Sequence, residues 1–155
     1  MTRFTAHNHS TADVDASQEQ IWTALTDTEL LPRLTPFLKR IDVVDGKWVW
    51  TLTSIPVLTK QISPSFTEVM TFEPMTHITF THDPSKTDEQ AGAEGSYTLT
   101  PNGARTHLAI DLEVSVDLPL PKLAKPGVLA GMNTVMAAMG SRFATNLLKH
   151  LDATR

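Results

Sequence analysis

The sequence contains no cysteine. This absence excludes disulfide bonds, thiolate metal sites and thiol catalysis. No stretch approaches the ~18 apolar residues that a membrane-spanning helix needs. The first nine residues contain no apolar run of signal-peptide length. We therefore expect a soluble, cytoplasmic protein.

Positive charge is also scarce: the chain has 13 Lys and Arg residues and 17 Asp and Glu residues, which gives a net charge of −4. Nucleic-acid binders are normally basic, so we expect no nucleic-acid partner. The motifs G-x-G-x-x-G, G-x-S-x-G and H-E-x-x-H and the P-loop are missing. His7 and His9 have no third ligand close in the sequence, so we expect neither a metal site nor a cofactor.

The remaining composition is that of a globular protein, with 155 residues, 41% hydrophobic and 19% charged. Such a chain is long enough to bury a core and too apolar to stay disordered. No internal repeat, low-complexity segment or linker divides it. We therefore expect a single domain that covers residues 1–155.

The clearest helical pattern lies at the end of the chain, from Pro126 to about Leu151. Apolar residues recur there every three or four positions, and roughly 26 residues would span about 39 Å, the width of a small domain. The apolar face is rich in methionine, which fills irregular space. The helix is therefore either an ordinary core helix or one wall of an adaptable apolar cavity. This face holds Val128, Met132, Val135, Met136, Met139, Phe143, Leu147 and Leu151.

Alternation of apolar and polar residues predicts strands in most of the remaining chain. Asp45-Gly46 predicts a hairpin that pairs Ile41 with Trp50, and a turn at Asn102-Gly103 would pair Tyr97 with Leu108. Two short helices are expected after the first strand, over residues 17–27 and 29–34, and residues 54–63 look irregular. The expected strands are residues 4–14, the two strands of the hairpin, 65–72, 77–82, 95–100 and 105–118.

These elements predict an α+β fold. A sheet with one apolar face needs a cover, and the terminal helix is the only element large enough to provide it. We therefore expect a curved antiparallel sheet of about seven strands wrapped around a long C-terminal helix.

The element order and three segments resemble the START-like or SRPBCC superfamily, which includes birch-pollen-allergen-like proteins, polyketide cyclases and aromatases, and coenzyme-Q-binding proteins. The resemblance covers nearly the whole chain and implies a helix-grip fold with a deep apolar cavity between sheet and terminal helix. Ligands and chemistries vary widely across this superfamily, so the resemblance leaves the ligand open. The segments are Ser17-Gln-Glu-Gln-Ile-Trp-Thr-Ala-Leu-Thr-Asp, Phe72-Glu-Pro and Phe143-Ala-Thr-Asn-Leu-Leu.

Parity along the strands and the helical period place a set of apolar side chains toward the interior. A ligand pocket needs only some of them, because the rest form the core. We expect a small hydrophobic molecule, such as a lipid, a quinone or a polyketide, to contact this set. Its members are Trp48, Trp50, Phe66, Met70, Phe80, Tyr97, Leu108, Ile110, Met132, Met136, Met139 and Phe143.

Glu68 and His82 are the polar exceptions on this face. A three-residue turn near Pro74 would place them opposite each other on neighbouring strands. A buried charge needs a partner, and a paired carboxylate can hold a histidine in one tautomer for proton transfer. The alternative is that both lie at the rim, in water or bonded to backbone.

Three functions remain open. The first is a carrier or sensor of a hydrophobic molecule; the second is a cyclase, aromatase or dehydrase in which Glu68 and His82 move protons and Tyr97 orients a carbonyl. The third is an interaction protein that uses an exposed face. The segment from Leu118 to Leu129 is either a connection or a lip that touches a membrane transiently. The oligomeric state is left open.

Overall fold

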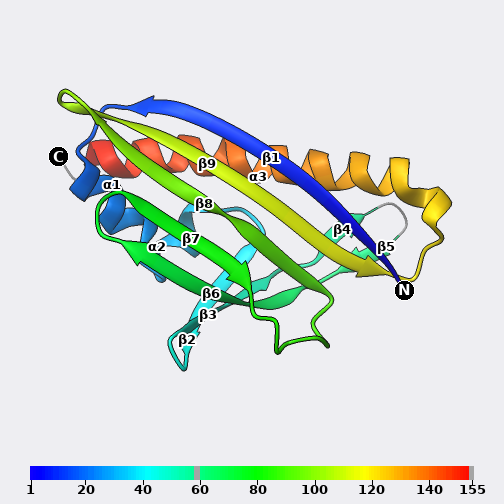
Figure 1. Cartoon of the computed structure of the whole chain (residues 1–155). Coiled ribbons are helices and arrows are strands. Elements are labelled where there is room, and N and C mark those ends of the chain that lie inside the picture. The colour runs from blue at the N-terminus through cyan, green and yellow to red at the C-terminus, as the bar shows by residue number, and fades with distance from the viewer. Residues whose placement is uncertain (58–59, 154–155) are drawn as a thin grey trace.

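The structure is a computed structural model, and it describes residues 1–57 and 60–153. Within these residues one curved sheet has the strand order β1-β9-β8-β7-β6-β3-β2, and β4 and β5 pair separately (Figure 1). All the strand pairs are antiparallel. The strands are β1 (Thr2–Val14), β2 (Leu38–Val44), β3 (Lys47–Leu52), β4 (Ile55–Val57), β5 (Lys60–Ile62), β6 (Ser65–Glu73), β7 (His77–His82), β8 (Ala91–Asn102) and β9 (Arg105–Leu118). The helices are α1 (Gln18–Leu25), α2 (Leu30–Leu34), the short 3-10 helix η1 (Lys122–Ala124) and α3 (Lys125–Ala153).

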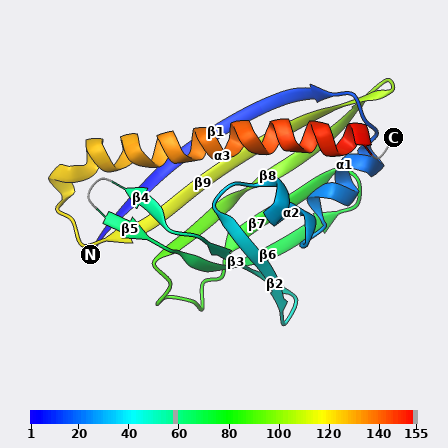
Figure 2. The ribbon, with the colours of Figure 1, turned by 180° about the vertical axis from the view of Figure 1, so that it is seen from behind.

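The long helix α3 crosses the sheet along its length. Figure 2 shows α3 in front of β1 and β9, with α1 and α2 beside its carboxyl end and β4 and β5 beside its amino end. Residues of α3 contact β1, β4, α1 and α2. This arrangement is the helix-grip α+β fold that the sequence predicts.

Two strand registers agree with the sequence. Ile41 lies opposite Trp50, and the turn residues Asp45 and Gly46 have φ of 52° and 77°, as a two-residue hairpin of the primed type requires. Between β6 and β7 the pairs also fall as expected, with Glu68 opposite His82. The apolar parity of each pair fixed these registers, because a slip of one residue would turn every side chain to the other face.

The expected register of β8 and β9 is wrong by two residues. Tyr97 lies opposite Ile110 rather than Leu108, because the last pair joins Asn102 to Arg105 and the turn is therefore Gly103-Ala104. Gly103 has φ of 64°, and glycine suits the first central position of a type II′ turn. A shift of two residues keeps the same faces inward, so the expected interior is preserved.

The core is packed at both ends of α3. At the carboxyl end Phe143, Leu147 and Leu151 lie in one buried cluster together with residues of α1 and α2. At the amino end Val128 and Met132 lie in a second cluster with residues of β1 and β9. The helix is therefore anchored to the rest of the fold by two separate contacts.

The middle of the sheet has its own cluster, to which α3 contributes no described residue. This third cluster is formed by Phe66, Phe80, Ala91 and Ala93. The middle of α3 is less buried than its ends, and Met139 is only half-buried. The buried clusters therefore include residues from both ends of α3 and none from the stretch between Met132 and Phe143.

Candidate functional site

Burial separates the twelve expected ligand contacts into two halves. One half is buried core, as expected for a set of which a pocket needs only some members: Trp48, Phe66, Phe80, Leu108, Met132 and Phe143. The other half is only partly buried, and we call its members the inner-face residues: Trp50, Met70, Tyr97, Ile110, Met136 and Met139. They come from β3, β6, β8, β9 and the middle of α3, and so define one candidate site between sheet and helix.

Aromatic pairs stiffen the sheet side of this site. The rings of Trp50 and Phe66 stack with an interplanar angle of 6° and centroids 6.5 Å apart, and those of Phe80 and Tyr97 lie 5.8 Å apart. Burial raises the pKa of the Tyr97 hydroxyl to about 12, so it stays protonated at neutral pH. The sheet therefore presents flat apolar surface together with one neutral hydroxyl.

Glu68 is the most unusual residue of the site, since it is only 1% exposed and neither carboxyl oxygen has a hydrogen-bond partner in the described chain. Burial raises its pKa to about 8; the backbone N–H of Ala93, which is near but does not meet hydrogen-bond geometry, opposes this rise, and the charges of Glu94 and Glu89 add to it. A buried polar group without a partner costs about 1–3 kcal/mol. Glu68 is therefore a neutral carboxylic acid at pH 7, held at a cost in stability.

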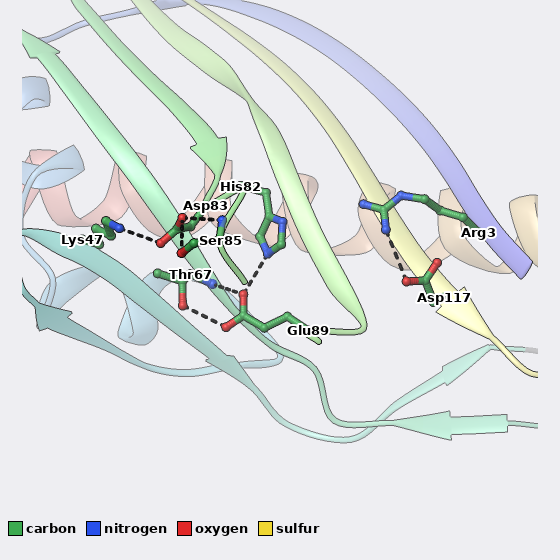
Figure 3. Close-up of polar contacts among 8 residues, drawn as sticks. All are labelled: Arg3, Lys47, Thr67, His82, Asp83, Ser85, Glu89 and Asp117. Carbon is green, nitrogen blue, oxygen red and sulfur yellow. Dashed lines mark hydrogen bonds and ion pairs between the residues drawn. The ribbon is translucent and has the colours of Figure 1, made fainter. Parts of the chain in front are cut away.

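The expected bond between Glu68 and His82 is not formed, although their backbones lie opposite each other. Nε2 of His82 lies 2.8 Å from Oε1 of Glu89, and Glu89 also accepts hydrogen bonds of 2.8 Å from the backbone N–H and the hydroxyl of Thr67 (Figure 3). The imidazole packs against Gly92, where an added Cβ would be 2.7 Å from Cγ of the histidine. His82 therefore bonds to Glu89, a carboxylate of the loop that follows β7. No hydrogen bond or ion pair in the described structure joins His82 to Glu68.

A second acid anchors the same loop. Asp83 accepts a 2.7 Å hydrogen bond from Nζ of Lys47, and its other carboxyl oxygen accepts 2.9 Å bonds from the backbone N–H and hydroxyl of Ser85 (Figure 3). The bond from Lys47 is the largest cause that holds the pKa of Asp83 well below its usual value. Nothing in the sequence indicates the roles of Asp83 and Glu89, because the alternation of inward and outward side chains applies to strands and not to residues in a polar loop.

A surface hollow lies at the end of the sheet near α1. Its volume is about 460 Å³, and it is lined by Trp22, Thr26, Thr28, Val43, Trp48 and Phe72. Phe72 shares the strand parity of Phe66 and Met70, which predicts an interior position, but its side chain is 40% exposed and contacts both tryptophans. Strand alternation fails for Phe72 because this residue lies beside the turn that ends β6, where no further part of the sheet covers its side chain.

Residues 1–57 and 60–153 contain neither a cluster of three or more His, Cys, Asp or Glu side chains placed as metal ligands nor a membrane-spanning helix. The segment from Leu118 to Leu129 connects β9 to α3 through η1, with Leu123 93% exposed. Its transient membrane contact stays a prediction.

The sequence from residue 5 to residue 153 matches the family described as polyketide cyclase / dehydrase and lipid transport. The chain belongs to this family. The match confirms the superfamily that the sequence resembles, and family and fold together support binding of a small hydrophobic molecule. No curated protein matches the sequence.

Solved structures share the helix-grip fold of this polyketide cyclase/dehydrase and lipid transport family member over 96% of its length. A conserved protein from Geobacillus kaustophilus aligns over 96% of its own chain with a TM-score of 0.74 and 19% identity. A START superfamily protein from Mycobacterium smegmatis aligns over 99% of its own chain, with a TM-score of 0.68 and 22% identity. The Zhui aromatase/cyclase from Streptomyces sp. R1128 aligns over 94% of its own chain, with a TM-score of 0.71 and 15% identity. At these identities the likeness shows the fold alone.

Proposed function

We propose that this protein binds a small hydrophobic molecule between the sheet and the middle of α3, as a carrier or sensor. The observation that carries the proposal is that the inner-face residues of both the sheet and the middle of α3 are only half-buried, whereas the two ends of the helix are buried. Apolar surface left partly in water gains about 25 cal/mol for each Å² that a ligand covers. The two flexible methionines of α3, Met136 and Met139, can adapt to ligands of different shape.

A charge placed on the inner face should abolish binding. We expect Met136→Lys to weaken the binding of Nile red, a neutral apolar dye, by about tenfold or more, because a bound ligand would desolvate the ammonium group. The measurement is a fluorescence titration, with the melting temperature recorded in parallel. Ala137→Lys adds the same charge at the adjacent exposed position of α3 and should leave the affinity unchanged. Equal affinities in the two variants would argue against the proposed site.

A second candidate function is acid catalysis of dehydration, and the buried neutral carboxyl of Glu68 favours it. The O–H of Glu68 would protonate the departing hydroxyl group, and the carboxylate that this leaves would take the α-proton, so that water departs as the C=C bond forms and the acid is regenerated. The test substrate is the hydroxybutyryl thioester of N-acetylcysteamine, followed by the absorbance of the enoyl product. We expect Glu68→Gln to lower turnover about 10²–10⁴-fold, as the loss of a general acid does. No turnover by the wild-type protein would reject this candidate and leave the carrier role intact.

A further inference from the structure

Three buried side-chain atoms without a hydrogen-bond partner in the described chain come from only two residues. They are both carboxyl oxygens of Glu68 and Nε1 of Trp50. Trp50 lies opposite Phe66, and Glu68 is two residues further along β6. The two residues are therefore diagonal neighbours on one face of adjacent strands, a separation that long side chains can span.

Both groups act as hydrogen-bond donors at neutral pH. The indole N–H of Trp50 can only donate. The charged groups that bear on Glu68 are Glu94 on β8 and Glu89 in the loop, and both oppose a negative charge on it. His82 is bonded to Glu89, and Lys47 to Asp83, so neither side chain is free to stabilise a carboxylate at Glu68. The protonated acid then offers an O–H on the same face of the sheet as the indole N–H.

We propose that Glu68 and Trp50 together bind a carbonyl oxygen of the hydrophobic ligand, and so select neutral ketones over hydrocarbons and amines of the same shape. This inference rests on the proposed binding of a hydrophobic molecule at the inner face. A carbonyl oxygen has two lone pairs and can accept from both donors at once. A ligand carboxylate would meet the surrounding negative charge, and a hydrocarbon would leave both donors without a partner.

The test compares three ligands of nearly equal size, which are methyl naphthyl ketone, ethylnaphthalene and naphthylethylamine, in displacement of Nile red. At about pH 6.5 we expect the ketone to bind wild-type protein about tenfold more tightly than the hydrocarbon, as two neutral hydrogen bonds would provide. The preference should fall as Glu68 ionises near pH 8, because a carboxylate only accepts.

Variants separate the two donors from general apolar binding. Glu68→Gln keeps an N–H donor that does not titrate, so the preference for the ketone should persist at about pH 9.5. Glu68→Leu and Trp50→Phe should each reduce the preference severalfold at about pH 6.5, where the preference is the ratio of ketone to hydrocarbon affinity measured in the same variant.

The outcomes distinguish this inference from the proposed function. Equal affinity of ketone and hydrocarbon for the wild-type protein would overturn the carbonyl site and leave hydrophobic binding intact. Tighter binding of the amine would show that Glu68 is ionised in the complex, and would overturn it as well. If neither Nile red nor the three ligands bind, the proposed function fails and the inference fails with it.

Discussion

Glu68→Leu is expected to stabilise the protein by about 4 kcal/mol more at pH 8 than near pH 4.5. The pKa of Glu68 is about 8 in the folded protein against 4.5 in the absence of burial. Between these pH values the folded state keeps a proton that the unfolded state releases. Stability of the wild-type protein therefore decreases as the pH rises through this window, by about 1.4 kcal/mol per pH unit. Leucine carries no proton, so the variant loses this dependence.

Urea denaturation at a series of pH values between 4.5 and 8.5 measures the effect. The control is Glu113→Leu, which removes an exposed carboxylate from β9 and should leave the pH dependence close to that of the wild type. Parallel pH profiles for the wild type and Glu68→Leu would show that Glu68 ionises normally. Because domains are stable by only about 5–15 kcal/mol, the expected difference is a large fraction of the total.

Such a cost to stability is itself an argument for function. A leucine at position 68 would pack among Phe66, Met70 and Trp48 with no desolvation penalty, so the fold gains nothing from the acid. Perturbed carboxyl groups of this kind are concentrated at binding and catalytic sites, where activity and stability conflict. Both functional hypotheses for the inner face use Glu68 in its neutral form.

Local sequence signals predicted the parts of the fold that local physics decides. The hairpin at Asp45-Gly46 is present as expected, and a capping box of Ser17 and Gln20 begins the first of the expected short helices. The turn before β9 was misplaced because Asn102-Gly103 and Gly103-Ala104 both offer a glycine with positive φ, and only the pairing of the long strands decides between them.

The sequence predicts which side of each element faces the candidate site, but not how deeply each side chain on that side is buried. Periodicity places Met132, Met139 and Phe143 on one side of α3, yet two of them are core and only Met139 is half-buried. That difference depends on which elements lie beside each turn of the helix, which is a long-range property. The partner of His82 was unpredictable for the same reason, since the loop that carries Glu89 folds back onto β6.

Phe143→Ala and Met139→Ala should separate stability from binding on the same face of α3. Phe143 is 8% exposed and packs with Leu147 and Leu151, so its truncation should cost about 3–5 kcal/mol. Met139, one turn earlier, is half-buried, and its loss should cost only about 1 kcal/mol because less apolar surface leaves the protein interior.

Ligand affinity should change in the opposite order, with a larger loss in Met139→Ala than in Phe143→Ala. Nile red should bind Met139→Ala severalfold more weakly, because the side chain forms part of the inner face, and should bind the folded fraction of Phe143→Ala as it binds the wild type. Urea denaturation and dye titration of the two purified variants give both quantities. A larger loss of affinity in Phe143→Ala than in Met139→Ala would move the binding site toward the carboxyl end of α3, into the cluster that the helix shares with α1 and α2.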